Sequence, residues 1–205
     1  GVRSNYDTDL VRPLVDLAVE LSGKRYHSDD YQGDSVSLRA IADHARAAAF
    51  LIADGVFPEK TGREYVLRRI MRRAIYHGRL LGIGGPFLHE VVAKVVELMG
   101  PDYPELVERR PVIDQVTRQE EIKFRETLER GMKLLDDEFK ALTRDQKNLP
   151  GEVVFKLYDT YGVPLDLTTM IAARRGHGVD EPGFAEEMQK QRARSVFDGG
   201  KAEDV

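Results

Sequence analysis

The segment from residue 61 to residue 80 carries six arginines and a single acidic residue, Glu64. At about 100° per residue, the arginines and two tyrosines fall on one side of a predicted helix, opposite an apolar side. The members of this arginine face are Tyr65, Arg68, Arg69, Arg72, Arg73, Tyr76 and Arg79. Guanidinium groups bind phosphate through forked hydrogen bonds, and tyrosine rings stack on bases, so the pattern favours nucleic-acid binding. A solvated face, or one that pairs with acids on the long helix further along the chain, fits the spacing equally well.

A second candidate is the sequence YDTYG at residues 158–162, which follows a short predicted helix. A carboxylate such as Asp159, where a helix passes into a loop, can accept a hydrogen bond from an amino group on a base edge. On local grounds another interpretation is favoured, in which Gly162 ends the helix and Asp159 is a local cap.

Other kinds of site are not supported by the sequence. The glycines at 82–85 lack the Lys-Ser/Thr that completes a phosphate-binding loop, and they predict a turn. Asp43-His44 resembles a pair found in metal-dependent phosphohydrolases, but no further ligands accompany it, and a helix histidine bonded to a neighbour is favoured. The absence of cysteine excludes disulfides, thiolate metal sites and cysteine nucleophiles. No catalytic residue and no metal site are therefore predicted.

The composition is that of an ordinary globular chain. Of its 205 residues, 41% are hydrophobic and 32% charged, which supports a core of usual size. No apolar run approaches the length of a membrane span and no signal peptide is recognisable, so a soluble, cytoplasmic protein is expected. The net charge of −4 argues mildly against nucleic-acid binding, but the basic segment reverses that argument.

Helical periodicity accounts for most of the chain, and no convincing strand pair is found, so the predicted fold class is all-α. The expected helices span residues 7–21, 38–53, 63–81, 87–99, 112–142, 152–157, 166–175 and 182–195. We expect a multihelical domain over 1–147, a smaller helical C-terminal part over 148–198, and a flexible tail over 199–205.

Taken in order, several segments resemble the alanyl-tRNA synthetases, a family of class II ligases. The segments are SNYDTDL (4–10), LRAIADHARAAAFLIADGV (38–56), GREYVLRRIMRRAIYHG (62–78), LERGMKLLDDE (128–138), FKLYDTYGVPLDLT (155–168), VDEPGF (179–184) and MQKQR (188–192). Their collinear succession covers nearly the whole chain. The resemblance implies the multihelical tRNA-recognition region that lies between the catalytic core and the editing domain.

The same resemblance implies a parent enzyme that joins alanine to ATP and then to the 3′ end of its tRNA. In that family, ATP and Mg²⁺ belong to the catalytic core, and zinc belongs to the editing domain. The family's ATP-binding motif ends just before the residues that resemble 1–5, so this chain is expected to lack the ATP and alanine sites. Its expected partners are the acceptor stem of tRNA(Ala) and the catalytic and editing domains of the same polypeptide.

The family identifies its tRNA chiefly by a G·U wobble pair in the acceptor stem. An asparagine before the arginine-rich helix and the aspartate of YDTYG read that pair. The aspartate corresponds to Asp159, whereas the asparagine corresponds to Lys60, a departure because lysine can donate a hydrogen bond but not accept one. Glu64 also replaces a usual glycine, and Val163 a usual phenylalanine. The residues expected to bind tRNA are Lys60, Arg63, Tyr65, Arg68, Arg69, Arg72, Arg73, Tyr158 and Asp159.

Two other functions stay open at the level of sequence. A helical interaction module would use the arginine face to dock an acidic protein surface, such as the catalytic domain of the same polypeptide. A diverged synthetase paralogue would read its tRNA differently, because Lys60 stands where the family has asparagine.

Overall fold

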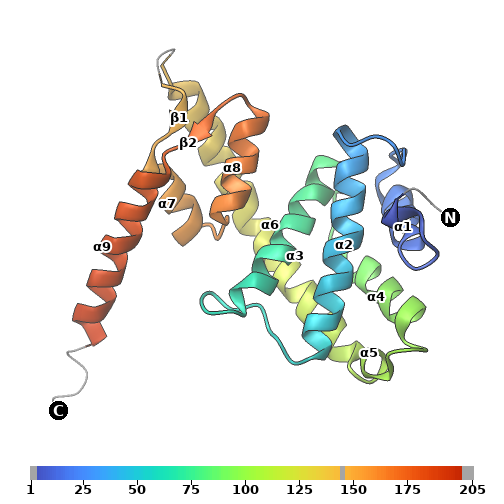
Figure 1. Cartoon of the computed structure of the whole chain (residues 1–205). Coiled ribbons are helices and arrows are strands. Elements are labelled where there is room, and N and C mark those ends of the chain that lie inside the picture. The colour runs from blue at the N-terminus through green and yellow to red at the C-terminus, as the bar shows by residue number, and fades with distance from the viewer. Residues whose placement is uncertain (1–3, 144–145, 200–205) are drawn as a thin grey trace. The chain divides into compact units, whose positions relative to one another are not determined.

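The computed structural model describes residues 4–143 and 146–199. Contacts within the chain define two compact units, Gly1–Arg125 and Glu126–Val205. Helices dominate both units (Figure 1), which confirms the predicted all-α class. The division at residue 147 expected from the sequence stays a prediction, and the expected tail lies outside the described residues from residue 200 onward. No helix in the described part of the chain is long and apolar enough to cross a membrane.

The first unit is assembled around one alanine-rich helix, α2, which packs against α1, α3 and α4. Its elements are η1 (Asn5–Asp7), α1 (Arg12–Ser22), α2 (Gly33–Ala53), α3 (Tyr65–Leu80), α4 (Leu88–Met99), α5 (Pro104–Glu108) and the first part of α6 (Arg110–Ala141). Ala42, Ala45 and Ala49 of α2 are completely buried. Their small side chains let neighbouring helices approach closely, so α3 has a fixed place against the core.

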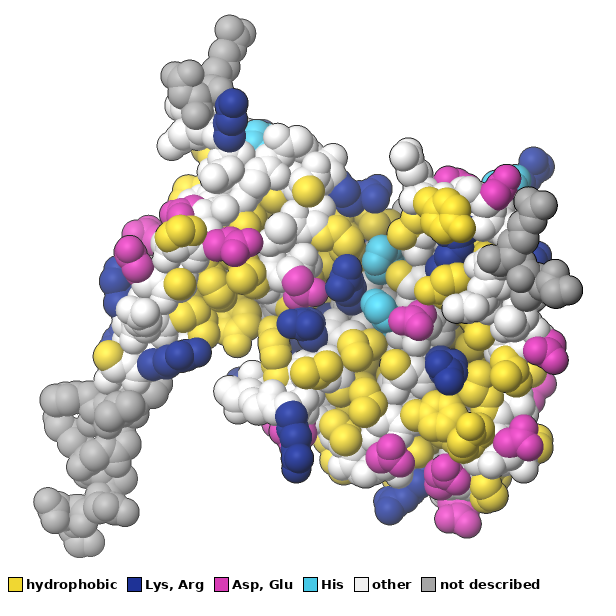
Figure 2. All heavy atoms as spheres, viewed as in Figure 1, with side chains coloured by type: hydrophobic (Ala, Val, Ile, Leu, Met, Phe, Trp, Pro, Cys, Tyr) yellow, Lys and Arg dark blue, Asp and Glu magenta, His cyan; other side chains and the backbone are white. Residues whose placement is uncertain are grey.

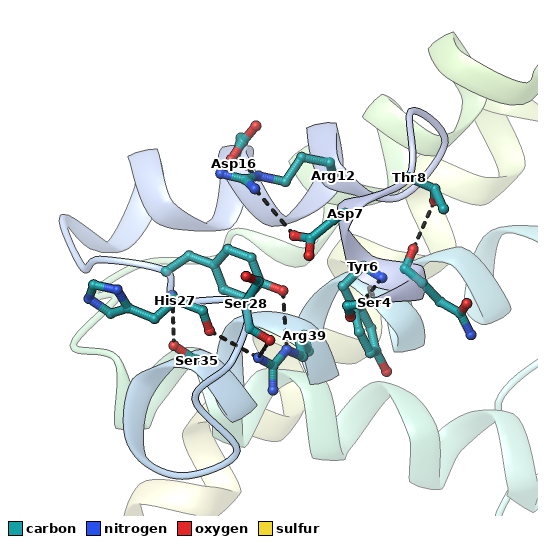
Figure 3. A network of polar contacts seen from close by, with 12 residues as sticks. Ser4, Tyr6, Asp7, Thr8, Arg12, Asp16, His27, Ser28, Ser35 and Arg39 are labelled. Carbon is teal, nitrogen blue, oxygen red and sulfur yellow. Dashed lines mark hydrogen bonds and ion pairs between the residues drawn. The ribbon is translucent and has the colours of Figure 1, made fainter. Parts of the chain in front are cut away.

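Two helices begin at places that differ from the sequence prediction. Helix α2 starts at Gly33, ahead of residue 38, so Ser37 lies inside the helix, where its Oγ is 3.0 Å from Nδ1 of His77. Helix α1 starts later than predicted, at Arg12. Asp7 pairs with the Arg12 guanidinium at 3.3 Å (Figure 3) and does not cap the helix. Asp7 is thus held in an ion pair with the first residue of α1, five positions along the chain.

The polar segment between α1 and α2 is held in place by buried Arg39 (Figure 3). Its guanidinium donates to the backbone oxygens of His27 at 3.0 Å and Ser28 at 2.9 Å. It also donates to the hydroxyl of Tyr26 at 3.2 Å and lies 5.3 Å from the centre of that ring. A cation placed over an aromatic face adds to these hydrogen bonds, so this loop has an ordered anchor in α2.

The second unit combines the end of α6 with three further helices and one short strand pair. Its elements are β1 (Asn148–Leu149), α7 (Gly151–Asp159), α8 (Leu165–Arg174), β2 (Gly178–Val179) and α9 (Glu181–Gly199). The two strands are parallel, with Asn148 opposite Gly178 and Leu149 opposite Val179. The expectation that the chain holds no strand pair is therefore wrong. Two residues per strand are too few for an alternating pattern to be visible in the sequence.

Helices α7 and α9 meet at two glycines. A Cβ atom on Gly151 would overlap the backbone of Gly183 and Phe184. Because backbone atoms on both sides cannot give way cheaply, we expect Gly151→Ala to lower the free energy of unfolding of this unit by about 1–3 kcal/mol. Chemical denaturation of the variant measures the change. Gly84→Ala is the matched control, because a Cβ there meets nothing within 4 Å; equal midpoints for the two variants would contradict the prediction.

Candidate nucleic-acid interface

The structure buries part of the arginine face predicted on α3. Tyr76 is 3% exposed, Arg72 4% and Arg68 8%, so this side of the helix faces the protein interior. Arg69 and Arg73 are exposed, one helical turn apart. The accessible basic surface of α3 is therefore narrower than the helical wheel indicated.

The two buried arginines share one carboxylate on α6. Oε1 of Glu120 lies 2.6 Å from Nε of Arg72 and 3.2 Å from Nε of Arg68. The Arg72 guanidinium also lies 4.6 Å from the centre of the Phe124 ring. Burial lowers the pKa of Arg72, and the charge of Glu120 opposes that shift. For Arg68 and Arg72 the structure thus shows the alternative interpretation, pairing with an acid on the long helix, and their burial does not support direct contact with RNA.

A second buried acid on α6, Glu121, binds the N-terminus of another helix. Glu121 accepts hydrogen bonds from the backbone N–H of Phe87 at 3.1 Å and of Leu88 at 2.8 Å, at the start of α4. Arg125 donates to the same carboxylate at 3.0 Å. A negative charge is favourable at a helix N-terminus, where backbone N–H groups lack partners within the helix. Glu120 and Glu121 are thus buried acids with partners on other helices, and they are not part of the solvated surface of the long helix.

The exposed cations of this region lie on α3 and in the connector before it. Lys60 and Arg63 are both exposed, and Tyr65, the first residue of α3, is half-buried. The Arg63 guanidinium is 3.3 Å from Glu64, and the backbone of Glu64 together with Arg63 lowers the pKa of that carboxyl group. Glu64 is consequently ionised at neutral pH and subtracts one charge from the basic surface. Figure 2 shows Lys and Arg side chains interspersed with acidic and hydrophobic ones over the face it presents.

Asp159 is the last residue of α7, and its carboxylate is exposed. Gly162 follows with φ of 66°, a left-handed conformation that glycine adopts readily. The carboxylate does not cap its own helix. Its Oδ1 accepts a hydrogen bond at 2.5 Å from Nε2 of Gln191 on α9. Sequence reasoning did not single out Gln191, although it lies in the MQKQR segment that resembles the family.

Tyr158, the other residue predicted in this segment, is half-buried between helices. Its ring packs edge-on against Phe184 of α9, with centroids 5.7 Å apart. The tyrosine therefore contributes to the packing of α7 on α9 next to Asp159.

Metal ligands do not gather within residues 4–143 and 146–199. No three His, Cys, Asp or Glu side chains there form a group that could hold a metal ion. Nδ1 of His44 is 3.1 Å from Oδ2 of Asp43, which confirms the interpretation of a helix histidine bonded to its neighbour. The candidate binding groups are therefore the exposed cations Lys60, Arg63, Arg69 and Arg73, and the exposed carboxylate of Asp159, which Gln191 holds through one oxygen.

Comparison with known proteins gives consistent matches. Residues 1–204 match the family model described as tRNA synthetases class II (A). The chain is 59% identical to the alanine–tRNA ligase of Sorangium cellulosum, over 89% of this chain and 20% of that protein. It is 49% identical to that of Anaeromyxobacter dehalogenans, over 100% of this chain and 24% of the relative, and 48% identical to that of Oleidesulfovibrio alaskensis, over 98% and 23%. The chain thus spans a fifth to a quarter of the length of these curated relatives.

Proposed function

Because the chain belongs to the class II alanyl-tRNA synthetase family, we propose that it binds the acceptor stem of tRNA(Ala) and reads a G·U wobble pair there. The observation that carries the proposal is the exposed carboxylate of Asp159 at the end of α7, within the segment that resembles the family's base-reading motif. ATP-dependent ligation of alanine is proposed for the whole protein. No step of that reaction is assigned to the residues described above.

The chemistry of the wobble pair suits a carboxylate. An A-form stem presents base edges in a wide, shallow minor groove, which a side chain at a helix end can reach. In a G·U pair the guanine amino group has no partner on the opposite base, so it can donate to an acceptor from the protein. A carboxylate accepts and cannot donate, and its charge strengthens the hydrogen bond. Asp159 therefore favours the G·U edge, where the opposite base uses neither amino hydrogen, over the G·C edge, where cytosine accepts one of them.

The exposed cations of α3 and of the connector before it are proposed to hold the phosphate backbone of the stem. Arg63, Arg69 and Arg73 would contact phosphates, which position the stem but carry no sequence information. Lys60 cannot accept a hydrogen bond, so it cannot reproduce every contact of the asparagine that the family has there. We propose that Lys60 contacts a phosphate and that base reading in this chain depends mainly on Asp159.

Substituting the exposed arginines of α3 tests the phosphate contacts. We expect Arg69→Gln and Arg73→Gln each to weaken binding to all stems alike, and to reduce the slope of log affinity against log salt by about 1. Titration of an acceptor-stem hairpin at several salt concentrations measures both quantities. Arg109→Gln is the control, since it removes the same charge from an exposed residue at the end of α5.

Two outcomes of this titration have opposite meanings. A reduced slope for the two α3 variants, with the control unchanged, supports phosphate contact. An unchanged slope with lower stability would show that Arg69 and Arg73 are structural. It would favour the second candidate function, a helical module that docks an acidic protein surface.

A further inference from the structure

We propose that Gln191 is the positioning residue for Asp159, an inference that rests on the proposed function. Nε2 of Gln191 donates to Oδ1 of Asp159 at 2.5 Å. The two residues lie 32 positions apart in the sequence and on different helices, so the hydrogen bond fixes the carboxylate relative to a second element. Gln191 holds Oδ1, and the proposal assigns the other carboxylate oxygen, Oδ2, to the ligand.

Contacts between α7 and α9 make this hydrogen bond part of a rigid arrangement. The helices touch at Gly151 and Gly183 and, about two turns further along each of them, at Asp159 and Gln191. The edge-on contact of Tyr158 with Phe184 lies between these points. The two helices therefore run alongside each other, and the position of Gln191 is determined before any ligand arrives.

The start of α9 is fixed independently of Asp159. Oδ1 of Asp180 accepts a hydrogen bond from the backbone N–H of Gly183 at 3.0 Å, and the N–H of Asp180 donates to the backbone oxygen of Leu149 at 3.0 Å. The short strand pair thus leads directly into the helix that carries Gln191. Removing the Gln191 side chain leaves these anchors in place, so the fold should survive the substitution.

The amide of glutamine is suited to this task by its charge. A lysine or arginine in its place would neutralise the carboxylate and compete with the guanine amino group for it. The neutral amide holds one oxygen and leaves the negative charge available, so the acceptor is oriented at little cost to its strength. Ordering the Asp159 side chain during folding also removes an entropy cost that would otherwise oppose binding.

The test is the preference of the full 205-residue chain for a G·U hairpin over a G·C hairpin of the same stem. We expect Gln191→Ala to reduce that preference about fivefold while leaving the affinity for the G·C hairpin unchanged. Gln191→Glu, which cannot donate at neutral pH and places a second carboxylate beside the first, should lose at least as much. Gln189→Ala is the matched control, because it is an exposed glutamine on the same helix. Thermal unfolding of each variant shows whether the fold is retained.

A double variant separates positioning from a general structural effect. If Gln191 acts through Asp159, adding Gln191→Ala to Asp159→Asn should cause no further loss of preference. A Gln191→Ala chain with full preference, beside an Asp159→Asn chain that has lost it, would overturn the positioning role and leave the proposed function intact. Equal losses on both hairpins, or additive losses in the double variant, would also overturn it. An Asp159→Asn chain with unchanged preference would overturn the proposed function itself.

Discussion

The Asp159→Asn variant is expected to lose about tenfold of its preference for an acceptor stem with G·U at the third base pair, relative to the same stem with G·C. The substitution removes the negative charge and replaces one acceptor oxygen by an NH₂ group, which faces the guanine amino group as donor to donor. The affinity for the G·C stem should change little, because Asp159 contributes no attraction to phosphates. Direct titration of both hairpins at one salt concentration gives the ratio.

The control for this variant is Asp102→Asn, which removes the same charge from an exposed residue in the turn before α5. Its preference should equal that of the unaltered chain. If Asp159→Asn weakened or strengthened binding to both stems by the same factor, the carboxylate would act only through its charge and would not read the base pair.

The Glu120→Ala variant is expected to show the largest loss of stability. It leaves the guanidinium groups of Arg68 and Arg72 buried without the carboxylate that both now contact. Breaking a buried ion pair by removing one partner costs about 3–5 kcal/mol, because an uncompensated charge stays in the interior. Denaturation with urea measures the change. Glu120→Gln should lose less, since its amide oxygen still accepts one hydrogen bond.

Glu129→Ala serves as the comparison, because Glu129 is an exposed acid on the same helix. Its free energy of unfolding should lie within about 0.5 kcal/mol of that of the unaltered chain. A Glu120→Ala chain with equally small loss would mean that Arg68 and Arg72 can leave the interior, and that the predicted arginine face is accessible to a ligand after all.

Much of the helical framework could be predicted because apolar residues recur at helical spacing, but the placement of α3 could not. The wheel puts Arg68 and Arg72 on the polar side of the helix, and periodicity has no means of showing that α6 covers part of that side. The missing signal was in α6 itself. Thr117, Glu120 and Glu121 follow Ile113 at helical spacing and so lie on the same buried face of α6 as Ile113 and Phe124. Acidic residues on such a face indicate that they have buried partners of opposite charge or buried N–H donors.

The candidate site was predictable only in part, for a similar reason. Asp159 was found through a local segment that resembles a family, and the structure places it at an exposed helix end. Gln191 could not be connected to it, because the hydrogen bond between them depends on how α9 packs against α7. The parallel pair of β1 and β2 was missed likewise, since its two strands are short and distant in the sequence.

The most direct test of the central claim is the affinity of the unaltered chain for two acceptor-stem hairpins that differ only in G·U or G·C at the third pair. Each hairpin is titrated at two salt concentrations. The account predicts tighter binding to the G·U hairpin, with an affinity for both that falls steeply as salt is raised. Equal affinity for the two hairpins at both salt concentrations would contradict base reading by Asp159.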